Sequence, residues 1–579
     1  MPQNRLPFAG FSRAVPRVAA GLLLLSLLAF DGPAAHAQAT PDGGALRNNL
    51  ERNLPQPALP DLTPKAGPDT LKTPALTGDT VVVSRFQFVG NTLLSDRALA
   101  RSVELYVNRS IDFAELQNAA AMAALAYRDK GYVATVSIPR QEIVDGIVTL
   151  KVVEAKYAGA SIDGSSTGRI NSELILARVE KAMNIEKAVN VNVLDRTLLL
   201  LNDLPGASVQ GGLAEGDADG ETKVVLRSQE KPLVTGAINN DSYGARSTGP
   251  ERYMVDFAIN SPAGKGEQYT LGLLATTGTR YGRGGVSFPV GLDGARLGMN
   301  TSFMEYRVIA GDNVASNIWG TSSTVGVDLS YPLIRSQQKN LFLTGGLTGK
   351  WFDNYSGGSL ARSYKSSVFT VAANGNWIDG WAGGASNQGS LSLTTGLLTI
   401  KDNNSLLSDQ AAANTNGGFN KLNAAISRNQ AVLDWLSVLL SFSGQYAWKN
   451  LDSSEKFYLG GPSGVRAYPV SEGGGSNGQL ATVELRMKLP KNVEFRVFHD
   501  DGRVKQNVDW FAAMGNTPNI LSYRGAGASL VWQGPRNFTF TATWARRIGT
   551  NPNPYPGSTN DQDGTKNIDR LWLAASLPF

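Results

Sequence analysis

One arginine and one aspartate carry the clearest chemical signal in this sequence. Arg466 stands near the middle of a glycine-rich segment, residues 460–475, which reads GGPSGVRAYPVSEGGG, and Asp500 lies in FHDDG, residues 498–502. A guanidinium offers a planar fork of donors that fits a carboxylate, and such a pair is stronger in a confined site than at an exposed surface. The spacing alone also fits a simpler interpretation, in which Arg466 is an ordinary exposed loop arginine and Asp500 an ordinary charge lining a pore.

The segments on both sides of the glycine-rich stretch alternate between apolar and polar residues with a period of two, as β-strands do. A regular polar row opposite an unbroken apolar row is what a membrane barrel requires, because lipid covers its outside and water fills its inside. The same parity places Phe498 and Asp500 toward the lumen. The apolar rows are Leu436, Val438, Leu440, Phe442, Tyr446 and Trp448 before the stretch, and Val483, Leu485, Met487 and Leu489 after it.

The connections between these strands indicate on which side the arginine lies. Outer-membrane barrels have short turns on the periplasmic side and longer loops outside. Residues 490–492 form a short turn, so the preceding connection, residues 449–479, is expected to be a long external loop with Arg466 at its middle. The glycines of this loop would let it fold back into the lumen.

Composition excludes several kinds of site. The 579 residues contain no cysteine and two histidines, so disulfides, thiolate metal sites and multi-histidine metal sites are ruled out. No metal ion or cofactor is expected. The net charge of +5 is spread along the chain without a basic run, and nucleic-acid binding is therefore not expected. His499 falls on the lipid-facing parity of its strand, which argues against an enzyme.

The N-terminus has the features of an export signal, predicted at residues 1–37. Arg5, Arg13 and Arg17 precede an apolar run from Val18 to Phe30, and Ala35-His36-Ala37 forms a cleavage signature. The run is shorter than the roughly 20 residues that cross a bilayer as a helix. If the mature chain spans a membrane, it must do so as a closed barrel, because lipid leaves no other way to satisfy the backbone.

Residues 38–80 combine a short polar helix candidate, Ala45 to Leu54, with a stretch rich in proline. Prolines at this spacing give an extended, semi-rigid tether without a core. Two interpretations remain open for this region: a disordered linker, or a linker whose helix docks elsewhere in the protein.

Two compact α/β modules are predicted next, at residues 81–157 and 158–230, each with the order strand, helix, helix, strand, strand. In the first, Asp112 and Glu115 resemble a capping box. The second contains predicted helices at Ser172 to Met183 and Val193 to Asn202, followed by LNDLPG, residues 201–206. The expected buried face of the helix that begins after Asp112 is Phe113, Leu116, Ala120, Ala123 and Tyr127.

The remaining residues, 231–579, consist of short alternating segments separated by turn-forming residues. At about 40 to 45 residues for each hairpin with its turn and loop, this length predicts about sixteen strands. The last alternating segment ends on Phe579, the final residue. A terminal strand that stops on an aromatic residue resembles those of outer-membrane barrels.

These motifs together resemble one family. VRAY, which is Val465, Arg466, Ala467 and Tyr468, is similar to the V-R-G-Y loop motif of the two-partner secretion outer-membrane transporters, the TpsB family that includes ShlB, FhaC and HecB. Phe498, Asp500 and Gly502 match its F-x-D-x-G strand motif. LNDLPG and the segment NDSYGARSTG, residues 240–249, also resemble the family. So do further residues of the loop: Glu455, Phe457, Gly460, Gly461, Glu472 and Gly473. Ala467 departs from the usual glycine, and its methyl group would strain a left-handed backbone.

The resemblance implies a mainly β fold, in which a C-terminal transmembrane antiparallel β-barrel of about sixteen strands follows two small α/β POTRA modules. It implies that the barrel lies in the outer membrane, in contact with lipid, and that the modules lie in the periplasm. Ala45 to Leu54 would be a plug helix. Arg466 would reach into the lumen and pair with Asp500, with Phe498 and Tyr468 packed around them.

The implied function is secretion of a large TpsA-like exoprotein partner, of the haemolysin, adhesin or contact-dependent toxin type, that carries an N-terminal secretion domain. The client would be recognised in extended form at POTRA edge strands and would pass without ATP through a barrel expected to be monomeric. Two other functions stay open: a general assembly factor for outer-membrane proteins, which would be expected to have more periplasmic modules, and a passive porin or nutrient receptor, which would not need these modules.

Overall fold

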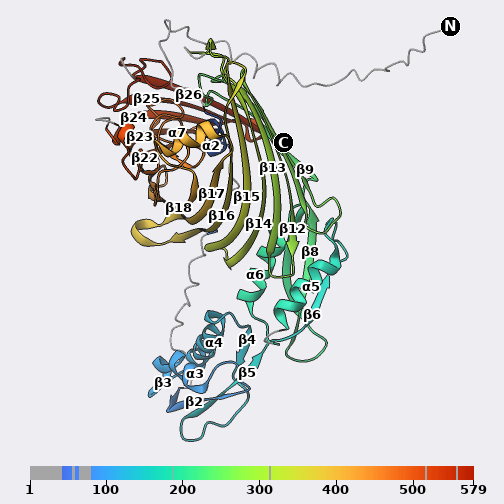
Figure 1. The fold of residues 1–579 in the computed structure, drawn as a ribbon. Helices are drawn as coiled ribbons and strands as arrows, with labels where there is room; N and C mark the ends of the chain where they lie inside the picture. Colours follow the sequence, from blue (N-terminus) through green and yellow to red (C-terminus); the bar gives the residue numbers. More distant parts are fainter. Residues whose placement is uncertain are drawn as a thin grey trace, which may run out of the picture.

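The computed structural model of the chain describes residues 42–54, 59–63, 80–184, 187–311, 314–514, 518–555 and 558–579. The predicted signal peptide, residues 1–37, lies outside the described residues, as does most of the predicted linker. Two small α/β modules are followed by a large barrel (Figure 1). No helix in the described ranges is both long and apolar enough to cross a membrane.

Sixteen antiparallel strands close into a single barrel, in agreement with the predicted fold class. Consecutive strands pair with one another, and the last strand pairs with the first through Ala574–Asp241 to Pro578–Ala237. The strands are β9 (Val234–Asp241), β10 (Arg252–Asn260), β11 (Gln268–Ala275), β12 (Thr279–Val290), β13 (Ala295–Arg307), β14 (Trp319–Arg335), β15 (Lys339–Ser356), β16 (Ser359–Asp379), β17 (Ala385–Ile400), β18 (Gly417–Leu433), β19 (Leu436–Ala447), β22 (Asn477–Leu489), β23 (Val493–Lys505), β24 (Ile520–Gln533), β25 (Thr539–Arg547) and β26 (Asp569–Pro578).

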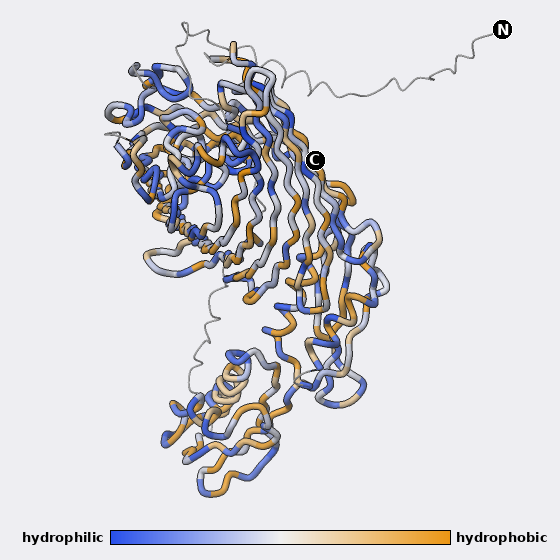
Figure 2. The backbone as a smooth tube through the Cα atoms, viewed as in Figure 1, coloured by the Kyte–Doolittle hydropathy of each residue, from blue (hydrophilic) through white to orange (hydrophobic). Residues whose placement is uncertain are grey.

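Residues of the barrel strands alternate between an apolar outer face and a polar inner face. Leu440, Phe442 and Tyr446 of β19 are exposed on the outside, whereas Gln445 is buried on the inside. Figure 2 shows this alternation of hydrophobic and hydrophilic positions along the strands. The pattern follows from the two solvents of a barrel, because alternate side chains meet lipid and the lumen.

The first module packs two helices against a three-stranded sheet of order β2-β5-β4. Its core is a single apolar cluster that includes Phe86, Leu99, Tyr127 and Leu150. The elements are β1 (Val81–Val83), β2 (Arg85–Val89), α3 (Asp96–Ser102), η2 (Glu104–Tyr106), β3 (Arg109–Ile111), α4 (Phe113–Asp129), β4 (Ala134–Ser137) and β5 (Ile147–Glu154).

The start of α4 differs from the prediction at one residue. The Asp112 side chain accepts a hydrogen bond from the Glu115 amide, and the two residues form a capping box, as predicted. The expectation that Phe113 is buried was wrong, since 61% of this residue is exposed. Side chains of a helix lean toward its N-terminus, so the side chain of the first residue points past the end of the helix and not onto the core.

The second module has the same plan, with a sheet of order β6-β8-β7 and an apolar core that includes Ile175, Val179, Leu201 and Leu226. Its elements are β6 (Lys156–Ile162), α5 (Ser172–Met183), α6 (Val191–Asn202), β7 (Ala207–Glu215) and β8 (Glu221–Glu230). This module sits on the periplasmic rim of the barrel. Lys181 forms an ion pair with Asp293 at 2.7 Å, and Arg196 donates to the Pro332 carbonyl at 2.8 Å.

Removing the α4 cap gives a local test of the first module. Asp112→Ala removes the acceptor for the Glu115 amide, and a lost N-cap costs about 1 kcal/mol, which corresponds to about fivefold faster opening. Hydrogen exchange of the first-turn amides of α4, measured on the whole protein, should accelerate by about that factor. Helix α5 serves as the internal reference, and equal acceleration there would contradict a local effect.

Candidate functional site

The connection between β19 and β22, residues 448–476, folds back against the inner wall of the barrel. It contains η5 (Ser453–Glu455) and a small ladder in which β20 (Phe457–Tyr458) pairs with β21 (Gly474–Gly475). The lumen loop, as we call residues 448–476, has its own apolar contacts with the wall. Leu459, Val465 and Tyr468 are buried in one cluster with Phe498, Leu521 and Tyr523 of β23 and β24.

Arg466 reaches two carboxylates on neighbouring strands. Its Nε and Nη2 donate to the two oxygens of Asp500 at 3.0 and 2.9 Å, and its backbone amide donates to the same carboxylate at 3.1 Å. Its Nη1 donates to Glu484 at 2.8 Å. Asp500 has no exposed surface, and Thr482 donates a further hydrogen bond to it at 2.9 Å. This arrangement excludes the interpretation of Arg466 as an ordinary exposed loop arginine.

Aromatic residues pack around the arginine in a way that differs in part from the expectation. The Arg466 guanidinium lies over the Phe498 ring at 3.3 Å from its centroid. The Tyr468 ring instead packs edge-on against Tyr523 and lies under the guanidinium of Arg547. The indole of Trp572, on the last strand, donates to the Arg466 carbonyl at 2.7 Å. The loop tip therefore contacts β23, β24 and the final strand of the barrel.

Glycines on the wall make room for the loop. A Cβ at Gly502 would lie 2.5 Å from the Leu459 side chain, and one at Gly525 would lie 2.7 Å from the Ala467 Cβ. Real side chains do not approach so closely, so both positions need glycine to keep the loop in this place. Ala467 is itself buried, and its backbone φ is not positive. Its methyl group therefore introduces no backbone strain.

A helix of the N-terminal segment, α2 (Gly43–Arg52), lies in the lumen near the external end of the barrel strands (Figure 1). Its Arg47 is buried and donates to Ser302, to Ser322 at 2.8 Å and to Thr324 at 3.0 Å on β13 and β14. The apolar side of the helix, Leu46 and Leu50, packs with barrel residues.

The same helix is bonded to the lumen loop. Asn48 donates to the Ser454 and Lys456 carbonyls, both at 3.0 Å. Arg52 donates to the carbonyls of Tyr458 and of Gly460, the latter at 2.7 Å. The helix and the loop therefore rest on each other as well as on the wall.

Glu455 connects the first part of the loop to β15 and β18. Its carboxylate forms ion pairs with Lys350 of β15 at 2.6 Å and Lys421 of β18 at 2.7 Å. Because Glu455 is buried, the two ammonium groups offset the cost of removing its charge from water.

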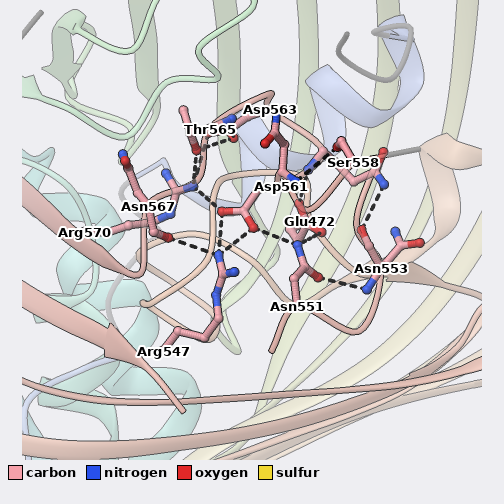
Figure 3. A network of polar contacts seen from close by, with 12 residues as sticks. Glu472, Arg547, Asn551, Asn553, Ser558, Asp561, Asp563, Thr565, Asn567 and Arg570 are labelled. Carbon is pink, nitrogen blue, oxygen red and sulfur yellow. Dashed lines mark hydrogen bonds and ion pairs between the residues drawn. The ribbon is translucent and has the colours of Figure 1, made fainter. Parts of the chain in front are cut away.

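A second polar network joins the lumen loop to the external connection between β25 and β26 (Figure 3). Asp561 of that connection accepts from Arg547 at 2.5 Å and from Arg570 at 2.8 Å. Glu472 of the lumen loop is fully buried beside it and accepts from the Gln562 amide at 3.0 Å and from Asn551 at 3.3 Å. Burial, together with the nearby Asp561 carboxylate, raises the pKa of Glu472 to about 8.

Sequence reasoning found only part of this site. It singled out Arg466, Ala467, Tyr468, Phe498, Asp500 and Gly502, all of which lie at the contact between loop and wall. It missed Glu484 as a second partner of Arg466, although strand parity already placed that residue on the polar face. It also missed Trp572. The family resemblance singled out Glu472, but its partners in the connection between β25 and β26 were not predicted, because the sequence carries no periodic signal for them.

The comparisons with known proteins agree with this architecture. Residues 220–517 match the model of the haemolysin secretion/activation protein family ShlB/FhaC/HecB, and residues 81–155 match the ShlB-type POTRA domain. The chain belongs to this family. It is a transporter of two-partner secretion with its barrel in the outer membrane, and POTRA modules of such transporters lie in the periplasm.

Individual relatives are distant in sequence. The heme/hemopexin transporter protein HuxB of Haemophilus influenzae strain 86-028NP is 22% identical over 78% of this chain and 81% of its own length. The outer membrane transporter CdiB of Dickeya dadantii strain 3937 is 23% identical over 81% of this chain and 82% of its own. The solved structure of CdiB from Escherichia coli has a TM-score of 0.64 at 21% identity and covers 92% of this chain and 95% of that one, which shows a shared fold.

Replacing the planar guanidinium of Arg466 by the single ammonium group of lysine should release the loop from the wall. Arg466→Lys keeps the charge but cannot make both bonds to Asp500 and the bond to Glu484, and a lost hydrogen bond to a charged group costs about 1.5 to 3 kcal/mol. A spin label on Ser463→Cys, which would be the sole cysteine, should become mobile in this variant. Arg524→Ala is the matched control, because Arg524 forms an exposed pair with Asp501 next to the buried one; comparable mobility in the control would contradict the assignment.

The high pKa of Glu472 predicts that loop docking depends on pH. The docked loop binds a proton that the free loop gives up near the ordinary glutamate pKa, so docking is strongest at low pH and weakens as pH rises toward 8. Between about pH 5 and pH 8, the ratio of docked to free loop should fall more than about tenfold. The Ser463→Cys spin label reports this ratio, and Glu472→Gln should remove most of the dependence; an unchanged dependence would contradict the assignment to Glu472.

Proposed function

We propose that this transporter exports one large exoprotein, of the haemolysin, adhesin or contact-dependent toxin type, and that the described structure is its closed state. The observation that carries the proposal is that α2 and the lumen loop both occupy the lumen and hold each other there through Asn48 and Arg52. An extended chain needs that space. Export therefore requires the helix to leave and the loop to move while its arginine remains available to hold a defined position.

The VRAY and F-x-D-x-G motifs would set that position. Arg466 and Asp500 form a buried, bidentate pair, and Val465, Ala467 and Tyr468 seat the loop against Phe498 and the glycine at position 502. In this proposal the pair is the fixed point around which the loop is arranged in the secretion-competent state.

The client would first bind to the POTRA modules as an added strand. In the described part of the chain, β7 pairs with β8 alone among the strands, and the Asn202 side chain covers its other edge at Val209. The second half of this strand, residues 210–215, is exposed. Adding a strand requires main-chain hydrogen bonds and little side-chain identity, which suits an unfolded client.

No catalytic role is proposed for the barrel. His499 lies on the exposed, lipid-facing side of β23, away from the carboxylates of the lumen. Folding of the client outside the cell would supply direction without ATP. We further propose that the barrel acts as a monomer, with its outward apolar rows covered by lipid.

The general assembly factor, the alternative that the sequence left open, has a related fold. The structure of BamA from Haemophilus ducreyi lacking POTRA domains 1–3 has a TM-score of 0.52 at 15% identity, covering 86% of this chain and all of that one. This likeness concerns the fold alone. A deletion strain separates the two functions, because loss of an assembly factor lowers many outer-membrane proteins, whereas loss of this transporter should abolish export of one client.

The proposed role of the VRAY arginine is tested by export itself. Arg466→Ala leaves Asp500 and Glu484 buried without their shared cation, so the loop should lose its fixed position and export of the client should fall at least about tenfold. The measurement is secreted client per folded barrel, with barrel abundance matched to wild type. Arg524→Ala should export normally, and undiminished export by Arg466→Ala would exclude the proposed role.

A further inference from the structure

A line of buried polar side chains crosses the periplasmic mouth of the barrel between the second module and the N-terminal segment. It begins at Asp203, which follows α6 in the LNDLPG motif. Arg335 donates from Nε and Nη2 to the two oxygens of Asp203, both at 2.8 Å. Arg335 is the last residue of β14, so this pair connects the second module directly to the barrel wall.

The line continues along the inner wall. Arg335 Nη1 donates to Asn340 Oδ1 at 3.0 Å, and Asn340 Nδ2 donates to Asn376 Oδ1 at 3.0 Å. Asn376 Nδ2 donates to the backbone carbonyl of Pro60 at 2.9 Å. Pro60 belongs to the segment that follows α2. The main chain also joins this segment to the rim, because the Thr63 amide donates to the Gln337 carbonyl at 2.8 Å.

The donor and acceptor of every hydrogen bond in the line are fixed by the groups at the two ends of the line, the Arg335 guanidinium and the Pro60 carbonyl. A guanidinium only donates and a carbonyl only accepts, so each asparagine must accept with its oxygen and donate with its nitrogen. Flipping either amide would lose at least two hydrogen bonds at once. Arg335, Asn340 and Asn376 are each at least 94% buried, so water does not readily replace a lost partner.

An irregularity in β14 brings Arg335 into the line. The strand has a bulge between Pro332 and Ile334, which inserts one residue against β15. Ser322, Thr324 and Asp328 face the lumen at even positions, and the extra residue reverses this parity so that Arg335 pairs with Asn340 on the inner face. Bulges commonly serve to re-aim a side chain in this way.

We propose that Arg335, Asn340 and Asn376 form a positioning relay, through which the segment around Pro60 and the second POTRA module stabilise each other at the mouth of the barrel. When the segment is in place, Asn376 is satisfied, and the amides hold Arg335 in the rotamer that clamps Asp203. When the segment leaves, the line loses its terminal acceptor and the module is held less firmly. The coupling is reciprocal, since any link between two binding equilibria acts in both directions.

The inference rests on the proposed function in one respect only, namely that the segment leaves the mouth of the barrel during export. The relay itself is testable without a client, so failure of the export proposal and failure of the relay are distinguishable. Other contacts of the module with the rim, such as the pair of Lys181 and Asp293, lie outside the relay and provide a control.

The decisive experiment is a mutant cycle on the whole transporter in lipid nanodiscs. Spin labels on Asp219→Cys in the second module and Asp434→Cys in a periplasmic turn would report the module's orientation as a distance distribution, because the chain contains no native cysteine. Asn376→Ala removes two hydrogen bonds, those with Asn340 and Pro60, and should raise the population of displaced orientations at least about fivefold in the full chain. Its effect should be clearly smaller in a chain lacking residues 42–63, where Asn376 has already lost the Pro60 carbonyl and keeps only the bond from Asn340.

An equal effect of Asn376→Ala in both chains would overturn the proposal, because it would mark a merely structural residue. No effect in the full chain would also overturn it.

A second experiment measures the effect of the module on the N-terminal segment, and it does not require Asn376→Ala to fold. Asp203→Asn weakens the clamp on the module, so a label on Asp61→Cys should become mobile in about fivefold more molecules. Lys181→Ala removes the ion pair of the module with Asp293 of the barrel but leaves the relay residues in place, so the mobility of this label should not change. Equal mobility in the two variants, or none in Asp203→Asn, would contradict the relay.

Discussion

A guanidinium buried between two carboxylates is the interaction on which the rest of this structure depends. Asp500 has no exposed surface, and Glu484 is nearly as enclosed. Two such charges facing each other inside a barrel wall would be unfavourable without a cation between them. Arg466 supplies that cation from a loop and not from the wall. Glu484 is also paired with Arg486 and Arg496 of the wall, whereas Asp500 forms its ion pair with the loop arginine. The charge of Asp500 is therefore compensated when the loop is inside the lumen.

The remaining contacts of the lumen divide into those that fix the loop and those that connect it to parts that have to move. Gly502 and Gly525 remove volume so that the loop can lie close to the wall, and Trp572 joins its tip to the last strand. By contrast, α2 reaches the loop through side-chain bonds to backbone carbonyls, which depend little on loop sequence. Such bonds can break without unfolding either element. This division suits the proposed closed state of a channel that must admit a chain.

Strand parity explains why much of the fold could be predicted from the sequence, whereas the pairing of Arg466 with Asp500 was predicted from the family resemblance. Alternation placed Asp500 and Glu484 on the inner face, and the short turn at residues 490–492 placed Arg466 in an external loop. Parity could not show that Arg466 binds both carboxylates, because that depends on how far the loop folds inward. The Glu472 network joins two long irregular loops, and no periodic pattern relates them. The bulge in β14 reverses parity before Arg335, so a strict alternation puts this residue on the wrong face.

The most direct test of the central claim is a double-mutant cycle between Arg466 and Asp500, with loop docking measured by the mobility of a spin label on the loop tip. Each single change to alanine should release the loop. If the two groups act as one pair, the double variant should release it no further than the more severe single variant, and a large coupling energy results. Additive effects of the two changes would contradict the account, because they would show that the arginine and the aspartate hold the loop independently.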